Sequence, residues 1–294
     1  MHAPLHCGAW IGPHHMLLRC GPHTLDLSRP RVVGILNVTP DSFCDGGRFL
    51  DHGRALDHAR QMLADGADLI DVGGESTRPG ADPVDEREEL ARVLPLISAL
   101  ASEGALVSVD TMKPAVVRAA VEAGAVMIND VNALQAAGAL EAVSATGAAV
   151  CLMHMQGTPQ TMQREPHYAD VVTEVRDFLA ARARICEAAG IARDRIVLDP
   201  GFGFGKTVDH NLRMLSALPV IVATGYPVLA GLSRKSSLGR ITGRGAGDLL
   251  AASLAAALAA IARGATLVRV HDVRATVDAI AVWRAVDAAG EMPA

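Results

Sequence analysis

Short apolar runs that end in a polar residue alternate with longer stretches of helical pattern from Arg31 almost to the end of the chain. Apolar runs rich in Val, Ile and Leu predict β-strands, and the longer periodic stretches predict helices. The expected strands are residues 32–38, 68–72, 106–110, 126–130, 148–154, 196–199, 228–232 and 267–270. The expected helices include residues 53–65, 85–103, 114–123, 169–189, 211–218, 248–263 and 273–289. Because each helix returns the chain to the start of the next strand, the strands are expected to pair in parallel.

Eight such strands are compatible with two parallel architectures, a closed barrel and an open, doubly wound sheet. The even spacing and the lack of a GxGxxG turn favour closure, so we expect an α/β protein with a TIM (β/α)8 barrel. No stretch resembles an interdomain linker, which predicts a single barrel domain over residues 31–290. Residues 14–28 alternate around a Cys-Gly-Pro-His segment, which predicts a β-hairpin within an N-terminal extension, residues 1–30.

Charge and cysteine content narrow the class of protein. The 294 residues carry a net charge of -5 without a basic block, which argues against a nucleic-acid partner. The five cysteines are scattered and lack CxxC spacing, so we expect no disulfide framework or zinc site and a reducing cytoplasm. Residues 1–13 lack the charged start of a signal peptide, and the longest apolar run, residues 249–262, is too short to span a bilayer. We therefore expect a cytoplasmic enzyme with no membrane partner.

Polar side chains follow the expected strands at the points where the strands end. They are Asn37, Asp71 with Glu75, Asp110, Asn129 with Asp130, His154, Asp199, Ser233 with Lys235, and Arg269 with His271. In a parallel barrel these ends lie on one face, and that face holds the active site. Helix capping is the alternative explanation, and it accounts for Asp110 or Asp130 taken singly. It does not account for Lys235, Arg269 or His271, so a shared polar pocket is favoured.

The residue types of this pocket indicate its ligand. Asp110, Asn129 and Asp199 supply acceptors for a heterocycle that displays several N–H groups. A second set suits an anionic group: Arg78, Lys235, Arg269 and His271. Four phenylalanines lie in loops expected on the same face, where they contact either a flat ligand or the barrel rim: Phe43, Phe49, Phe202 and Phe204. The combined pattern favours a planar amino-heterocycle that carries a phosphate.

One glycine-rich segment, residues 201–207, resembles the end of a phosphate-binding P-loop. That motif requires a further glycine at a position where this chain has Pro200. A nucleoside triphosphate site is therefore not expected there.

Nine segments together resemble the signature motifs of dihydropteroate synthases. They are Gly34-Ile-Leu-Asn37-Val-Thr-Pro-Asp-Ser-Phe43, Asp45-Gly-Gly47, Asp71-Val-Gly-Gly-Glu-Ser-Thr-Arg-Pro-Gly80, Ser108-Val-Asp-Thr111, Ile128-Asn-Asp-Val131, Leu152-Met-His-Met-Gln-Gly157, Asp199-Pro-Gly-Phe-Gly-Phe-Gly-Lys206, Ser233-Arg-Lys-Ser236 and Arg269-Val-His-Asp-Val273. The resemblance covers about residues 31–286. It implies a folate-pathway transferase (EC 2.5.1.15) that joins p-aminobenzoate to 6-hydroxymethyl-7,8-dihydropterin pyrophosphate, giving 7,8-dihydropteroate and pyrophosphate. It also implies Mg2+ as cofactor, a homodimer, and sulfonamides as inhibitors.

The same resemblance implies roles for individual residues. Those expected to contact the pterin are Asp110, Asn129, Met153, Asp199, Lys235 and Arg269. Those expected at the pyrophosphate are Asn37, Arg78, Arg269 and His271, with Asn37 also beside Mg2+. Those expected around p-aminobenzoate are Thr77, Pro79, Phe204, Lys235 and Ser236. The expected catalytic residues are Asp110, Lys235, Arg269, His271 and Asn37, and no covalent nucleophile is implied.

Two other functions share the pterin contacts. A folate–corrinoid methyltransferase domain would not need residues 76–79 or 233–236, which are complete here. A non-catalytic pterin-binding paralogue should have lost a residue of a lid or of the p-aminobenzoate pocket, and none is missing. The loops at residues 37–49 and 75–83 are rich in glycine and proline, and we expect them to act as lids over the pyrophosphate.

Overall fold

The computed structural model describes residues 16–38, 48–78 and 80–290. Most of the first expected lid lies outside these ranges, and so do Phe43 and Pro79. Within the described ranges, no helix is both long enough and apolar enough to cross a membrane.

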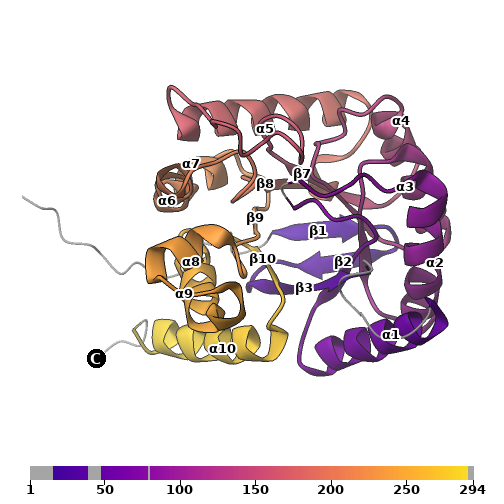
Figure 1. The fold of residues 1–294 in the computed structure, drawn as a ribbon, viewed down its shortest axis with the longest axis horizontal. Helices are drawn as coiled ribbons and strands as arrows, with labels where there is room; N and C mark the ends of the chain where they lie inside the picture. Colours follow the sequence, from indigo (N-terminus) through magenta and orange to yellow (C-terminus); the bar gives the residue numbers. More distant parts are fainter. Residues whose placement is uncertain (1–15, 39–47, 79, 291–294) are drawn as a thin grey trace, which may run out of the picture.

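Eight parallel strands form the centre of the molecule (Figure 1). In chain order they are β3 (Arg31–Asn37), β4 (Leu69–Gly73), β5 (Val107–Asp110), β6 (Met127–Asp130), β7 (Ala149–Met153), β8 (Ile196–Asp199), β9 (Leu229–Ala230) and β10 (Leu267–Val270). Hydrogen-bonded neighbours follow the order β8-β7-β6-β5-β4-β3-β10-β9. A parallel bridge between Leu198 of β8 and Val228, just before β9, joins the two ends of the sheet. The sheet therefore closes, which confirms the predicted (β/α)8 barrel.

Strand β9 is shorter than the sequence predicts, because it covers two residues instead of 228–232. The chain leaves the sheet after Ala230 and turns over residues 232–235, where the backbone N–H of Lys235 donates to the carbonyl of Leu232. This turn takes Lys235 out of the sheet and into the loop above it.

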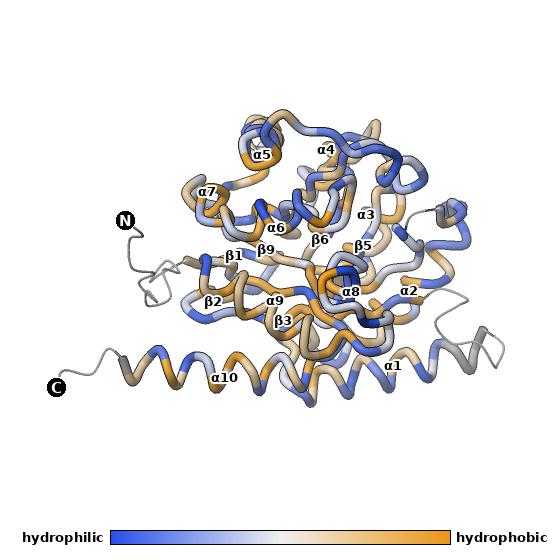
Figure 2. Tube along the Cα trace, turned by 60° about the vertical axis from the view of Figure 1, so that its left-hand side comes forward, coloured by the Kyte–Doolittle hydropathy of each residue, from blue (hydrophilic) through white to orange (hydrophobic). Residues whose placement is uncertain are grey.

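Helices surround the barrel (Figure 1). They are α1 (Arg48–Ala64), α2 (Glu86–Ser102), α3 (Pro114–Glu122), α4 (Ala139–Ser144), α5 (Val171–Ala188), α6 (Val208–Ser216), α7 (Leu218–Val222), α8 (Ser236–Thr242), α9 (Leu250–Ile261) and α10 (Val273–Gly290). Hydrophobic and hydrophilic residues alternate along α10 (Figure 2), as expected of a helix that packs one face on the barrel.

Glycines end the first three helices in the left-handed conformation that the sequence suggests. Gly66, Gly104 and Gly124 have φ angles of 101°, 83° and 109°. Glycine adopts such angles without a steric penalty, and it lets the chain leave the helix sharply. A Cβ on Gly124 would also lie 2.5 Å from the Cβ of Ala101, so α3 and α2 pack closely only because this side chain is absent.

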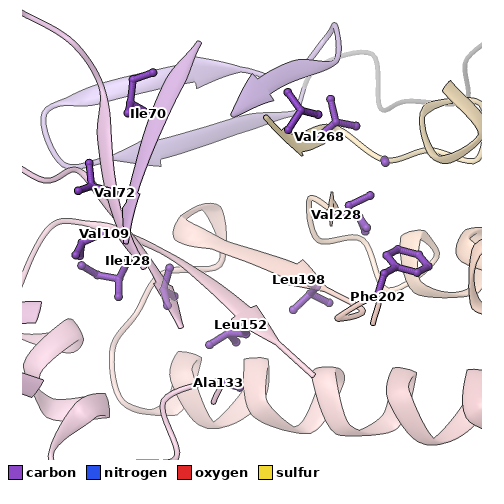
Figure 3. Close-up of a cluster of buried hydrophobic side chains, with 14 of the residues drawn as sticks. Ile70, Val72, Val109, Ile128, Ala133, Leu152, Leu198, Phe202, Val228 and Val268 are labelled. Carbon is purple, nitrogen blue, oxygen red and sulfur yellow. The ribbon is translucent and has the colours of Figure 1, made fainter. Parts of the chain in front are cut away.

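The hydrophobic core has two layers, because side chains alternate across each strand. The outer layer lies between the strands and the helices, and it includes Val72, Ile128, Leu198 and Phe202 (Figure 3). The inner layer lies inside the barrel, and it includes Val33 and other strand residues: Leu69, Met127, Cys151, Val197, Leu229 and Leu267.

An antiparallel hairpin, β1 (Leu17–Cys20) and β2 (His23–Asp26), precedes the barrel and confirms the predicted hairpin. Leu18, Cys20 and Leu25 join the inner layer. The hairpin therefore covers the end of the barrel where the strands begin, which leaves the opposite end available for a site.

Candidate functional site

The carboxyl ends of four neighbouring strands bring three expected site residues to one level. Asn37 is aligned with Gly73, Gly73 with Asp110, and Asp110 with Asn129. A Cβ on Gly73 would lie 3.5 Å from the Oδ1 atom of Asn37 and 3.5 Å from the Cβ of Asp110. The glycine therefore leaves space between the Asn37 amide and Asp110.

Arg269, at the end of β10, reaches across the barrel to two carboxylates. Its Nε donates to Oδ2 of Asp71 at 2.5 Å, and its Nη2 donates to Oδ2 of Asp110 at 2.8 Å. Burial raises the pKa of Asp110 to about 7, although the charge of Arg269 acts to lower it. Burial alone would lower the pKa of Arg269, but Asp71 and Asp110 outweigh it and raise that pKa, so the guanidinium stays charged.

Asp71 is a central residue of the site, and the sequence motifs assigned it no role. Its Oδ2 also accepts from Nδ2 of Asn129 at 3.1 Å, and its Oδ1 accepts from the hydroxyl of Ser108. Oδ1 of Asn129 is buried and has no hydrogen-bond partner among the described residues. The site therefore holds a buried amide acceptor that a ligand N–H group can satisfy. The sequence placed Asp71 among the polar residues at the strand ends, but it gave no sign of which neighbours the carboxylate binds.

Asp199 lies on the other side of the barrel end, at the end of β8. Its Oδ1 accepts from the backbone N–H of Gly201 at 2.7 Å. Burial raises the pKa of Asp199, against the lowering effect of the Gly201 hydrogen bond. A Cβ on Gly231 would lie 4.0 Å from both Oδ2 of Asp199 and the Cβ of Arg269. Met153 is aligned with Asp199 on the adjacent strand and is buried, and its contact with the pterin stays a prediction.

Lys235 and Phe204 come together from different loops. Nζ of Lys235 lies 4.1 Å from the centre of the Phe204 ring, which is a cation–π contact. Burial lowers the pKa of Lys235 to about 8, and Arg269 lowers it further while Asp199 opposes this effect. The next residue, Ser236, begins α8 with an exposed side chain. The structure thus groups three residues expected around p-aminobenzoate, although their roles there stay predictions.

Lys206 is a buried cation that the sequence interpretation missed. Its Nζ donates to the carbonyls of Gly201 at 3.0 Å and Phe204 at 3.1 Å, and it lies 3.0 Å from Nδ1 of His154. Burial lowers the pKa of Lys206 to about 7, and burial lowers the pKa of His154 to about 3. The ammonium group is therefore used to hold the loop that carries Phe204. A P-loop lysine instead contacts a phosphate.

His271 and Arg78 differ in how firmly the structure holds them. Nδ1 of His271 lies 3.0 Å from the hydroxyl of Ser233. Burial lowers the pKa of His271 to about 4, so its ring is neutral at neutral pH and acts as a hydrogen-bonding group without charge. Arg78 is exposed in the loop after β4, and its pyrophosphate role stays a prediction.

The base of this second expected lid is anchored. Glu75 pairs with Lys113, which also lies 2.5 Å from the buried carboxylate of Glu89. Thr77 is half-buried two residues beyond Glu75. The anchor fixes where the loop starts, whereas its outer part carries the exposed Arg78.

A surface hollow of about 530 Å³ lies beside α8, outside the cluster of strand ends. Ser236 is the one expected site residue in its lining, and the others are Arg234, Gly239, Arg240, Gly243, Arg244, Gly245 and Leu249. We assign the site to the buried strand-end cluster, because the convergent polar groups lie there.

Comparisons with known proteins agree with the motifs. Residues 33–271 match the family of pterin-binding enzymes. The dihydropteroate synthase of Escherichia coli strain K12 is 49% identical over 269 residues, which cover 91% of this chain and 95% of that protein. A structure of Xanthomonas albilineans dihydropteroate synthase with 4-aminobenzoic acid has a TM-score of 0.89 and 52% identity, covering 95% of this chain and 100% of that one. A structure of the Burkholderia cenocepacia dihydropteroate synthase complexed with 7,8-dihydropteroate has a TM-score of 0.85 and 53% identity. The match covers 94% of this chain and 98% of that one. The chain belongs to the dihydropteroate synthase family of pterin-binding enzymes.

Proposed function

We propose that this protein joins p-aminobenzoate to 6-hydroxymethyl-7,8-dihydropterin pyrophosphate, forming 7,8-dihydropteroate and pyrophosphate. The observation that carries the proposal is the convergence of buried acceptors on one barrel end beside a lysine–aromatic pair. Asn129 offers an amide oxygen that has no partner in the described part of the chain, and Arg269 and Asp110 form the charged group next to it. Solved relatives that contain 4-aminobenzoic acid and 7,8-dihydropteroate support this reaction.

The pterin is the ligand that suits the acceptor set. Its amino-pyrimidinone edge displays several N–H groups, and Asp110, Asn129 and Asp199 present oxygen atoms at the strand ends. Met153 supplies a buried apolar side chain for the flat ring. When it is ionised, Asp110 in this buried site also favours positive charge on a nearby ligand atom.

That preference matches the chemistry of the reaction. The lone pair of an aryl amine is delocalised into its ring, so the amine is a weak nucleophile. We infer that the bond between C9 and the pyrophosphate oxygen breaks ahead of attack, and that Asp110 stabilises the positive charge on C9. The amine nitrogen then bonds to C9 and loses a proton to solvent. No covalent bond to the protein is needed.

The departing pyrophosphate requires cationic and N–H groups. Arg269 stays charged and has N–H groups beyond those bonded to Asp71 and Asp110. His271 is neutral, so it contributes a hydrogen bond to the leaving group and no charge. Arg78 is exposed, so its contact would require the loop after β4 to close over the ligand.

The residues present fit Mg2+ as the cofactor. The amide oxygen of Asn37 is the hard type of ligand that Mg2+ prefers, and the missing side chain at Gly73 leaves space beside it. The described residues contain no cluster of three or more His, Cys, Asp or Glu side chains that would hold a metal without substrate. Asn37 would therefore share the ion with pyrophosphate oxygens and water. When bound, the ion neutralises charge on the leaving group.

We assign the second substrate to the loops around Lys235 and Phe204. The aromatic ring of p-aminobenzoate suits the Phe204 face, and its carboxylate suits the start of α8 at Ser236 with Lys235 beside it. Because this pocket is retained, we also propose sulfonamides as competitive inhibitors. We further propose a cytoplasmic homodimer, in line with the family resemblance.

Formation of dihydropteroate from the two purified substrates with Mg2+ tests the proposal. We expect product from the wild type and a fall in rate of at least about a hundredfold in Asp110→Asn and Lys235→Ala, which corresponds to about 2.7 kcal/mol of barrier. Tight binding of the pterin without product in the wild type would instead identify a non-catalytic paralogue.

A further inference from the structure

Asp71 is buried beneath the pocket, with 1% of its side chain exposed. Its oxygens accept hydrogen bonds from Nε of Arg269, from Nδ2 of Asn129 and from the hydroxyl of Ser108. An ionised carboxylate has acceptors and no donor, so each neighbour must turn a donor toward it. Asp71 therefore determines the orientation of the two groups that also border the pocket, Asn129 and Arg269.

Asp71 determines which atom of the Asn129 side-chain amide, the nitrogen or the oxygen, can bind a ligand. Because Nδ2 is bonded to Asp71, the other end of the amide is Oδ1, which is buried without a partner among the described residues. Rotation of the amide by half a turn would set Oδ1 against the Asp71 carboxylate and lose the hydrogen bond. The pocket therefore offers an acceptor at this point, which suits a ligand N–H group and penalises a ligand acceptor.

For Arg269, Asp71 provides the second of two anchors. Nε is bonded to Asp71 and Nη2 to Asp110, so two nitrogen atoms of one planar group are fixed. A guanidinium held at two points cannot turn about its long axis, and its remaining N–H groups keep one direction.

We propose that Asp71 is a positioning residue for the pterin pocket, which holds the Asn129 amide with its oxygen available to the ligand and fixes the plane of the Arg269 guanidinium. Asp71 acts through these two side chains and does not touch the ligand. This inference rests on the proposed function, because it takes the pterin as the ligand of Asn129 and Arg269.

Two substitutions of nearly equal shape separate the charge of Asp71 from its acceptors. Asp71→Asn keeps one acceptor oxygen for Asn129 and Arg269, and its new NH2 group can face the Ser108 hydroxyl, which can accept. Asp71→Leu removes both acceptors. We expect the Kd of 6-hydroxymethylpterin, measured by calorimetry, to rise about fivefold in Asp71→Asn and roughly a hundredfold in Asp71→Leu. The KM for p-aminobenzoate at saturating pterin substrate should change less than about twofold, since the hydrogen-bond partners of Asp71 include no described residue of that pocket.

A double-mutant cycle tests whether Asp71 acts through Asn129. We expect the effect of Asp71→Leu on the pterin Kd to shrink to about a tenth when Asn129 is already Ala. Additive effects would overturn the inference, and so would a wild-type Kd in Asp71→Leu. If the leucine variant does not fold, Asp71→Ser takes its place. The serine side chain is too short for its hydroxyl to reach Asn129, so the same rise in the pterin Kd is expected.

Asp130→Asn is the matched control. The sequence grouped Asp130 with the polar strand-end residues, but the structure bonds its buried carboxylate to the loop after β6, where its oxygens accept from the backbone N–H groups of Asn132 and Leu134 at 2.6 and 3.0 Å. We expect this variant to lower thermal stability and leave the pterin Kd unchanged, whereas an equal loss of pterin affinity in both carboxylate variants would refute a specific role of Asp71. Product formation by the wild type is measured alongside. A wild type that makes no dihydropteroate contradicts the proposed function, whereas an active wild type with unaffected Asp71 variants contradicts only this inference.

Discussion

Replacement of Lys206 by methionine tests the unusual environment of this buried ammonium group. Methionine has a similar length and no charge. In the folded protein, burial lowers the pKa of Lys206 from 10.5 to about 7. The unfolded chain therefore holds more protons on this residue between those two values, and the free energy of unfolding gains a contribution that rises with pH in this window. The contribution is largest above the unfolded pKa and is lost as the pH falls toward 7.

The size of the effect follows from the two pKa values. Between pH 7 and pH 9, a shift of this size changes the free energy of unfolding by about 2 kcal/mol. We expect the wild type to gain this amount relative to Lys206→Met when urea unfolding is measured at both pH values. His154, the nearest titratable partner of Lys206, has a pKa lowered to about 3 and does not titrate in this range.

Lys113→Met is the control for this prediction. Ion pairs with Glu75 and Glu89 raise the pKa of Lys113 in spite of partial burial, so Lys113 stays charged in both states between pH 7 and pH 9. The free-energy difference between the wild type and this variant should be the same at both pH values. A pH-independent difference for Lys206→Met as well would refute the reasoning about its burial.

Three further predictions concern the site and its sulfonamide binding. Because burial raises the pKa of Asp110 to about 7, the affinity for 6-hydroxymethylpterin should fall as the pH is lowered from 7 to 5.5 in the wild type and stay constant in Asp110→Asn. An equal dependence of the calorimetric Kd on pH in both proteins would contradict this. Gly201→Ala should lower the free energy of unfolding by about 3 kcal/mol or more, because φ is 69° and the new Cβ would lie 1.9 Å from the carbonyl oxygen of His154. The control Gly53→Ala, on an exposed helix face, should be neutral or stabilising. Sulfonamides should raise the KM for p-aminobenzoate without changing kcat, and turnover that high sulfonamide concentrations leave unaffected would count against the assigned pocket.

Local patterns in the sequence are sufficient to predict most of the fold. Apolar runs and the glycines after α1, α2 and α3 mark where elements begin and end, because strand and helix periods and left-handed turns depend on neighbouring residues. Strand β9 was predicted too long, since residues 231–232 continue the apolar run and yet lie outside the sheet, where the chain enters a turn. The packing of the hairpin on the inner layer depends on contacts between distant segments, which no local pattern contains.

In the candidate site, too, local sequence patterns predicted some residues, whereas contacts between distant segments were missed. Asp110 and Asn129 were predicted on one face because strand ends share a face, and the structure aligns them on adjacent strands. The role of Asp71 was missed because it depends on Arg269, which lies 198 residues later in the sequence, and on the orientation of the Asn129 side-chain amide. Lys206 was missed because a lysine in a glycine-rich loop usually indicates a solvent-facing or phosphate-binding group, and here the loop folds its carbonyls around it.

The central claim is that the strand-end cluster binds the pterin and couples loss of pyrophosphate to capture by p-aminobenzoate. Its most direct test is pyrophosphate release from the dihydropterin pyrophosphate with Mg2+, measured with and without p-aminobenzoate, together with the dihydropteroate formed. We predict that p-aminobenzoate stimulates release and that pyrophosphate and dihydropteroate appear in equal amounts. Tight pterin binding with no release stimulated by p-aminobenzoate would contradict the account.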